Sequence, residues 1–413
     1  MLRSYPGTEE REQPMPEQQP THASHARKKP RIIGYDIAKS LAMLFVVILH
    51  YSFYTRYYSS GVAGTLLTTL CVACVPLFFA VNGALLLLRP LDIRKHLKKT
   101  VTIVAVLAVW KTIVALFCVF VDRSHPAPIG TLVKDFLRFQ LGGGFGEYPV
   151  GYFWFMNALL AVYLVYPLVK LVFDDPGRIA LRTVLAVLFA FTVGKDTLVV
   201  LLDMLGAATH HEFASILGAL GEFYIFGSYG YVLLYFMVGG LVARAMMPEG
   251  LKGGVDGIRW PLRSISRPIA ALLVILCYAV SFGIQRFQHA TKGTNLTIDY
   301  GYWLLPTFAA TLLALMLCLT VKGTGAKAAP VRAIVEIVGK NTFGIYMLHM
   351  IAIVLFAKAQ AHPAFVAVFE AHLNSGAITT LLNIACVLIL FAACLAVSVV
   401  LRRIPVVRTL FTV

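Results

Sequence analysis

An acid, a base and a histidine interrupt one apolar stretch near the start of the chain: Asp36, Lys39 and His50. At helical periodicity Asp36 and Lys39 lie about 60° apart and Lys39 and His50 about 20° apart, with roughly 16 Å of helix rise between the last two. Because polar groups are costly in hydrocarbon, this shared stripe predicts a functional site lining a protein interior or a watery cavity. A histidine there can remove a proton from a hydroxyl. The alternative is a buried ion pair with a histidine that bonds two helices.

A second polar stripe lies near the other end of the chain. Thr342, Tyr346 and His349 follow i, i+4, i+7 spacing on an apolar stretch, and so share one helix face. The two stripes are expected to cross the membrane in the same direction, so both bring a histidine toward its middle or outer half. A packing role remains the alternative for each histidine.

The composition predicts a polytopic membrane protein. Of 413 residues, 59% are hydrophobic and only 14% are charged. The formal net charge of +16 does not require nucleic acid as a partner, because cytoplasmic loops of membrane proteins collect Lys and Arg. All seven cysteines fall in apolar segments and are interpreted as packing residues, with neither a metal site nor a disulfide framework expected.

Ten apolar segments predict an all-α fold of about ten transmembrane helices. The expected spans are 35–55, 66–88, 98–121, 152–173, 180–202, 228–247, 268–288, 302–321, 341–358 and 376–401. Twenty Lys and Arg fall in the loops of one side and seven in those of the other, which predicts cytoplasmic termini. Residues 1–30 lack an apolar run and are expected to be a disordered cytoplasmic tail, followed by one membrane domain over 31–413.

The loop 89–100 is the densest basic patch between the predicted spans. Its five cations are Arg89, Arg94, Lys95, Lys98 and Lys99. Such a patch follows from membrane topology and attraction to anionic lipids alone, or it docks a polyanionic cytosolic ligand through its phosphates. Lys111 lies in mid-membrane and is a site candidate by default. The glycine-rich stretch 142–147 is interpreted as a flexible rim over an outer cavity.

Two stretches of the first half resemble one family, the integral-membrane acyltransferases of acyltransferase family 3. The family pattern Asp-x-x-Arg/Lys, ten residues, His matches Asp36, Lys39 and His50. The segment from Phe78 is similar to the family's Phe-Phe-x-x-Ser-Gly-x-x-Leu, with Asn82 where the family usually has serine. An amide can still donate and accept hydrogen bonds.

Two further stretches carry the same resemblance. The basic run 95–99 stands where the family often has paired arginines; the lysines here keep the charge without bidentate phosphate recognition. Trp154, Tyr163 and Pro167, together with 339–349, are similar to the family's later motifs, including Gly-x-x-Ser-x-x-x-Tyr-x-x-His. The similarity covers roughly 31–401.

The resemblance implies transfer of an acyl group, acetyl above all, from cytosolic acyl-CoA to a hydroxyl of a cell-surface or exported glycan, or a lipid-linked sugar. It implies a multi-pass protein of the cytoplasmic (inner) membrane, in contact with membrane lipids, with acyl-CoA as co-substrate and no permanently bound cofactor. His50 would be the general base, with a covalent acyl-histidine as the less favoured variant. Lys39 would bind a CoA phosphate or, with Asp36, hold the helix mouth in shape.

The remaining site residues are assigned on the same basis. Acyl-CoA is expected to bind Arg89, Arg94, Lys95, Lys98, Lys99 and Lys111. The substrate cavity is expected to include Asn82, Trp154, Tyr163, Tyr346 and His349. Lys111, Asn82 and His349 are the candidates for the oxyanion partner. The aromatic residues have a milder interpretation as an interfacial belt.

A solute transporter or a flippase for lipid-linked glycans is the competing class of protein. Such a protein would also carry intramembrane charge and a basic inner face. Transporters often contain internal repeats with interrupted helices in matching positions. No convincing repeat of the 35–55 pattern occurs in the second half of this chain. The sequence assigns no oligomeric state.

Overall fold

The computed structural model describes most of the membrane domain. The described residues are 31–55, 57, 61–123, 130, 133, 151–175, 177–222, 229–246, 265–292, 301–321 and 328–412. Residues 32–413 group into one compact unit. The predicted tail 1–30 and the predicted glycine-rich rim 142–147 lie outside the described residues.

The described part of the chain is helical and contains no strand, so the predicted all-α class is confirmed. Eight helical segments there are long and apolar enough to cross a membrane, and two shorter apolar helices accompany them. The helices that correspond to the ten predicted spans are α1 (Ile33–Tyr54), α2 (Val62–Cys71) with α3 (Cys74–Leu86), α4 (Ile93–Phe117), α6 (Trp154–Phe173), α7 (Ile179–Phe189) with α8 (Lys195–Thr209), α9 (Gly230–Met246), α10 (Arg267–Lys292), α12 (Leu305–Leu319), α13 (Ala329–Ala359) and α15 (Gly376–Leu401).

The second span is interrupted where α2 ends and α3 begins. Pro76 lies in the first turn of α3. Proline has no N–H, so it cannot continue the hydrogen-bond ladder from the preceding turn, and it is tolerated where a new helix starts. The break therefore places the first turn of α3 within the membrane-spanning segment instead of at its edge.

The ninth span is longer than the sequence predicts. It was expected over 341–358, but α13 begins at Ala329 and continues for 31 residues. Glu336 pairs with both Arg332, at 2.8 Å, and Lys340, at 3.5 Å, each four residues away. Such i,i+4 pairs stabilise a polar helical turn, which extends α13 beyond its apolar part.

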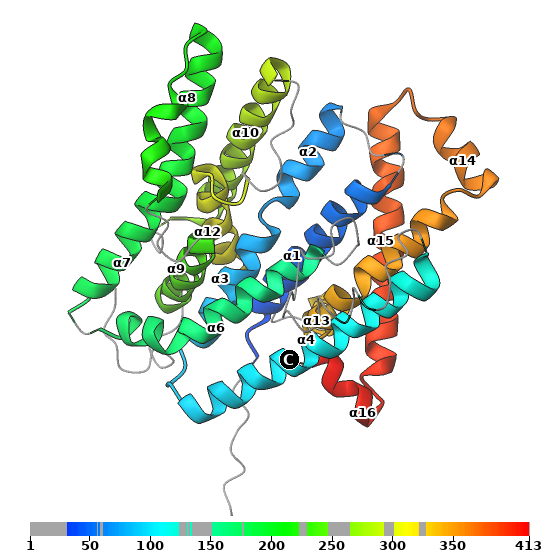
Figure 1. Ribbon diagram of the computed structural model, residues 1–413, viewed down its shortest axis with the longest axis horizontal. Helices are drawn as coiled ribbons and strands as arrows, with labels where there is room; N and C mark the ends of the chain where they lie inside the picture. The colour runs from blue at the N-terminus through cyan, green and yellow to red at the C-terminus, as the bar shows by residue number, and fades with distance from the viewer. Residues whose placement is uncertain are drawn as a thin grey trace, which may run out of the picture. The chain divides into compact units, whose positions relative to one another are not determined.

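α1 lies at the centre of the packing and contacts α3, α12, α13 and α15 (Figure 1). α3 packs closely against α9 because Gly83 faces the backbone of Phe236 and Gly239 faces the backbone of Ala80, leaving no room for a side chain at either glycine. Small residues allow this approach between helices in a membrane. We call the end of each helix on the side of the basic loop 89–100 its inner end, and the opposite end its outer end.

Candidate active site

α1 and α13 run side by side in the same direction. Near their inner ends Lys39 donates a hydrogen bond from Nζ to the carbonyl oxygen of Gly339, at 2.9 Å. Toward their outer ends the rings of His50 and His349 meet edge to face, with centroids 4.9 Å apart and an angle of 69° between planes. The two polar stripes of the sequence thus face each other, and they bring together two histidines that lie far apart in the chain.

The protonation of the two imidazoles follows from their neighbours. Nδ1 of His50 lies 2.9 Å from the carbonyl oxygen of Val46, and Nδ1 of His349 lies 2.5 Å from that of Tyr346. Because a carbonyl oxygen only accepts, each Nδ1 carries a proton, so in the neutral form of each ring Nε2 is the acceptor. Nε2 of His349 is buried and has no hydrogen-bond partner among the described residues. In its neutral form, each ring therefore offers Nε2 as a base.

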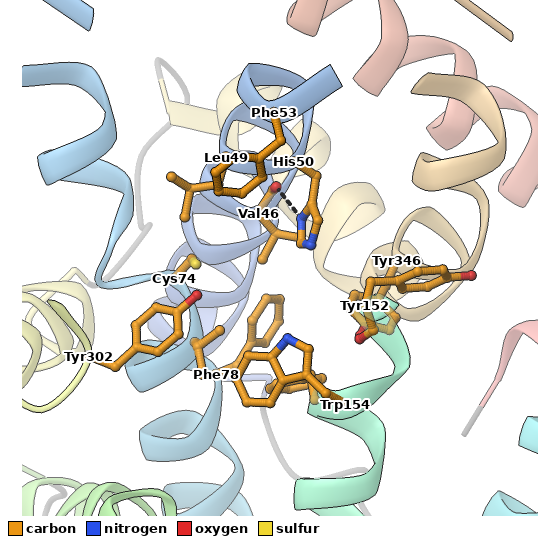
Figure 2. Close-up of a pocket in the computed structure, with 12 residues that line it drawn as sticks. Val46, Leu49, His50, Phe53, Cys74, Phe78, Tyr152, Trp154, Tyr302 and Tyr346 are labelled. Atoms are coloured by element: carbon orange, nitrogen blue, oxygen red, sulfur yellow. Dashed lines mark hydrogen bonds between the residues drawn. The ribbon is translucent and has the colours of Figure 1, made fainter. Parts of the chain in front are cut away.

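A cavity of about 390 Å³ opens beside His50 (Figure 2). Outer parts of α1, α3, α6 and α13 form it, together with the turn before α12. The lining residues are Val46, Leu49, His50, Phe53, Cys74, Val75, Phe78, Tyr152, Trp154, Phe155, Tyr302 and Tyr346. Seven of the twelve are aromatic, so most of the surface around the base is apolar.

On one side of the cavity, the hydroxyls of Tyr152 and Tyr346 bond to backbone carbonyl oxygens and not to groups inside the cavity. The hydroxyl of Tyr152 donates to the carbonyl oxygen of Met347 at 3.3 Å, and that of Tyr346 donates to the carbonyl oxygen of Tyr152. Figure 2 shows the Tyr346 hydroxyl directed away from His50. These bonds join the turn before α6 to α13, so the two rings present mainly their carbon surfaces to the cavity.

On the other side, the indole of Trp154 is stacked between two tyrosines. Its ring lies 6.0 Å from that of Tyr302 and 6.1 Å from that of Tyr229, at small interplanar angles. Offset stacking of this kind fixes the orientation of aromatic rings. The aromatic wall is thus rigidly built from α6 and from the turns that precede α9 and α12.

Asp36 and Lys39 form a polar contact at the inner end of the α1–α13 pair. Lys39 Nζ lies 3.1 Å from Asp36 Oδ1, and Asp36 is 2% exposed. A side chain at Gly339 would collide with the Asp36 carboxylate, so glycine is required for the helices to approach here. This Asp36–Lys39–Gly339 contact fixes the register of α1 against α13. His50 follows Lys39 by eleven residues and His349 follows Gly339 by ten, so the same register sets the histidine pair.

The five predicted cations of the 89–100 loop are exposed around the start of α4. Asp92 caps this helix by accepting from the backbone N–H of Lys95 at 3.1 Å and pairs with the Lys95 ammonium at 2.9 Å. These hydrogen bonds hold the pKa of Asp92 below its ordinary value. The loop therefore presents a concentrated positive surface on a well-formed helix start.

Tyr163 lies beside this loop, away from the outer cavity. Nζ of Lys99 stands 5.6 Å from the centre of the Tyr163 ring, and the ring of His96 stacks on Tyr163 at 5.5 Å. His96 also donates from Nε2 to the carbonyl oxygen of Tyr163 at 2.7 Å. The sequence grouped Tyr163 with Trp154, whereas Trp154 begins α6 beside the cavity and Tyr163 lies near the middle of that helix, against the start of α4.

Two other predicted site residues lie outside the cavity lining. Asn82 donates from Nδ2 to the carbonyl oxygen of Phe78, 2.9 Å away on its own helix. Lys111 is buried on α4, next to Trp110, whose indole N–H donates to the carbonyl oxygen of Leu410 at 2.7 Å. Neither side chain is among those that surround the cavity at His50. Their predicted roles stay predictions.

Several lining residues were not assigned to the site from the sequence. Cys74 was interpreted as a packing residue, and Tyr152, Phe155 and Tyr302 were not assigned to the site. Only the clustering of aromatic residues at the start of the fourth span pointed to two of them. The sequence contains no signal that joins Cys74 to Tyr302, because helix packing alone brings them together.

The fold and the histidine site together define an integral-membrane protein with an intramembrane base beside an apolar cavity. The family model of an acyltransferase domain, acyltransferase family 3, matches residues 32–403. The chain therefore belongs to this family, and it is a multi-pass membrane acyltransferase. No curated protein and no solved structure gave a significant match.

Proposed function

We propose that this protein transfers an acyl group, with acetyl as the simplest case, from cytosolic acyl-CoA to a hydroxyl of an extracytoplasmic cell-surface or exported glycan, or of its lipid-linked precursor. The membrane concerned is the cytoplasmic (inner) membrane. The observation that carries the proposal is His50, which lines the cavity with its Nδ1 proton held by Val46 and its Nε2 lone pair left for catalysis. Membership of an acyltransferase family supplies the class of reaction.

The donor is proposed to reach His50 from the inner end. The exposed cations of the 89–100 loop suit the phosphates of CoA, since charge-assisted hydrogen bonds to phosphate are strong. From the level of Lys39 to that of His50, α1 rises by roughly 16 Å. The slender pantetheine arm would span this distance and bring the thioester to the base, while the acceptor arrives from the outer end.

The proposed step is a direct transfer. His50 Nε2 takes the proton of the acceptor hydroxyl as its oxygen forms a bond to the thioester carbonyl carbon. The tetrahedral intermediate then expels the CoA sulfur as the C–S bond breaks. The protonated imidazole returns its proton to that sulfur, so the products are the ester and free CoA thiol. General-base catalysis of this kind contributes typically about 10²–10⁴-fold.

His349 would support His50 without donating to the developing oxyanion. Its Nδ1 proton is held by Tyr346, so its Nε2 is an acceptor in the neutral ring. An acceptor cannot stabilise negative charge, which argues against His349 as the oxyanion partner. Asn82 and Lys111 remain the proposed candidates for that role.

Replacing His50 tests the proposal most directly. We expect His50→Ala to lower release of CoA thiol from acetyl-CoA by about 10²–10⁴-fold, with acyl-CoA binding retained. The assay uses the full chain purified in lipid nanodiscs, with mass spectrometry of glycans from cells that express each variant. His372→Ala is the matched control, because this half-buried histidine also has Nδ1 against a backbone carbonyl four residues earlier, that of Val368, but lies outside the cavity lining.

The outcomes separate the proposal from its competitor. A well-folded His50→Ala protein with undiminished glycan acylation would exclude His50 as the base. A wild-type protein that binds acyl-CoA without ever releasing thiol, and whose loss leaves surface glycans unchanged in mass, would favour transport over catalysis.

A further inference from the structure

The cavity beside His50 contains almost nothing that could neutralise a charged substrate group. Among its twelve described lining residues there is no Lys, Arg, Asp or Glu. Two of its three tyrosine hydroxyls already donate to backbone carbonyls, as described above for Tyr152 and Tyr346. A carboxylate moved into such surroundings would lose its hydration without gaining a cation. An apolar group, in contrast, gains free energy there in proportion to the surface it buries.

The direction in which the donor enters assigns an occupant to this cavity. If CoA is held at the inner end, its arm lies along the inner part of α1 and its thioester stands level with His50. The acyl chain is the part of the molecule beyond the thioester, so it must extend toward the outer end. The cavity lies in that direction, since its walls are the first turns of α3 and α6, the turn before α12 and the outer half of α1.

We infer that this cavity receives the acyl chain of the donor and selects uncharged, apolar chains longer than acetyl. The inference rests on the proposed function and adds the class of acyl group. An acetyl methyl group is about as large as one water molecule, whose share of liquid volume is about 30 Å³. The cavity measures about 390 Å³, so acetyl leaves most of its apolar surface uncovered. The acceptor hydroxyl reaches His50 from the outer side, where Phe53 is 62% exposed at the rim.

A pair of four-carbon thioesters tests the assignment. Butyryl-CoA and succinyl-CoA have chains of the same length, and only succinyl ends in a carboxylate. We expect butyryl-CoA to bind more tightly than acetyl-CoA, by about fourfold for each added methylene, the ratio that corresponds to roughly 0.8 kcal/mol. Succinyl-CoA should bind no better than acetyl-CoA. Calorimetry on the full chain in nanodiscs gives the dissociation constants, and the rate of thiol release gives kcat/KM for each thioester.

Filling the cavity should reverse the preference for butyryl-CoA over acetyl-CoA. Val75 lies on the cavity wall in the first turn of α3, and Val75→Phe should cost butyryl-CoA at least tenfold more affinity than acetyl-CoA. Leu85→Phe is the matched control, because Leu85 is half-buried on the same helix and is not a lining residue. If Val75→Phe fails to fold, as judged by size-exclusion chromatography, Phe78→Ala enlarges the cavity and should shift the preference toward hexanoyl-CoA.

Failure of the inference differs from failure of the proposed function. Equal affinities for acetyl-, butyryl- and succinyl-CoA, or tighter binding of succinyl-CoA, would overturn the acyl-chain assignment while the acyltransferase activity stands. A change in KM for the glycan acceptor on Val75→Phe, with acyl selectivity unaltered, would assign the cavity to the acceptor instead. No binding of CoA or of any thioester would overturn the proposed function itself, and the inference with it.

Discussion

The inner and outer ends of the α1–α13 pair treat their polar groups in opposite ways. At the inner end Lys39 bonds to Asp36 and to Gly339, and Asn341 accepts hydrogen bonds from Ser398 and Arg402, at 3.0 and 3.1 Å. At the outer end each histidine directs Nδ1 to a carbonyl oxygen of its own helix, and Nε2 of His349 has no hydrogen-bond partner among the described residues.

This difference separates a structural task from a chemical one. A buried polar atom without a partner costs about 1–3 kcal/mol, so a fold retains one only where something offsets the cost. His349 Nε2 is such an atom within the described part of the chain. The satisfied groups at the inner end set how α1 lies against α13, and the same register brings His50 to the cavity with His349 against it. The inner contacts therefore position the two histidines.

Removing the inner contact should therefore damage catalysis at a distance. We expect Lys39→Ala to lower kcat by up to about 10²-fold with little change in KM for acyl-CoA, because a shift of about 1 Å at His50 has an effect of that size. Stability should also fall, by about 3 kcal/mol or less, since Asp36 keeps a buried charge and Lys39 is itself 22% exposed. Steady-state kinetics and thermal unfolding in nanodiscs measure both effects.

Two companion variants sharpen this prediction. Lys340→Ala removes an exposed ion pair on the inner part of α13 and should leave kcat and KM unchanged. Asp36→Asn combined with Lys39→Met removes both charges and should recover stability relative to Lys39→Ala. A rise in KM for acyl-CoA at constant kcat would instead assign Lys39 to a CoA phosphate.

The basic loop should affect donor binding without affecting chemistry. Replacing both Lys98 and Lys99 with alanine should raise KM for acyl-CoA about twofold to fivefold for each lost charge, the effect of exposed ion pairs worth up to about 1 kcal/mol. The increase should shrink at high salt, because screening weakens such contacts. Arg403→Ala, an exposed cation also on the inner side, is the control. If Arg403→Ala raises KM for acyl-CoA as much as the loss of Lys98 and Lys99 does, the loop contributes only a general attraction for anions.

The smallest expected effect concerns the start of α4. Asp92→Ala removes the helix cap and its pair with Lys95, so the melting temperature should fall slightly while kcat stays unchanged. Because the folded pKa of Asp92 is lowered, its contribution is present above the unfolded pKa of about 3.9 and is lost as the pH falls through the lower folded value. Thermal unfolding of both proteins between pH 3 and pH 7 checks this. If the difference in melting temperature between the two proteins stays constant across that range, the Asp92 carboxylate is not its source.

Much of the fold followed from the sequence because hydrocarbon imposes simple rules. Apolar length located ten apolar helical segments, eight of which are long enough to cross a membrane, and the break at Pro76 and the extension of α13 changed only their internal form. The two polar stripes were also predicted, each on its own helix. That His50 and His349 touch was beyond this reasoning, since periodicity on one helix does not determine which face of another it meets.

The cavity walls were harder to predict for a different reason. Cys74, Tyr302 and Phe155 have the same side chains whether they face lipid, a neighbouring helix or an empty space. Tyr163 was grouped with Trp154 through the family resemblance, and α6 places its ring beside His96 and Lys99. Ionisable residues reveal their surroundings through the cost of burying them, and apolar residues do not.

The pairing of α1 with α13 also has a consequence for how the protein is made. Lys39 and Gly339 are 300 residues apart, so their contact can form only after almost all of the intervening helices have been synthesised and inserted. His50 enters the membrane with the first helix but gains its partner with the ninth span. A nascent chain would therefore hold an incomplete site until late in its biogenesis.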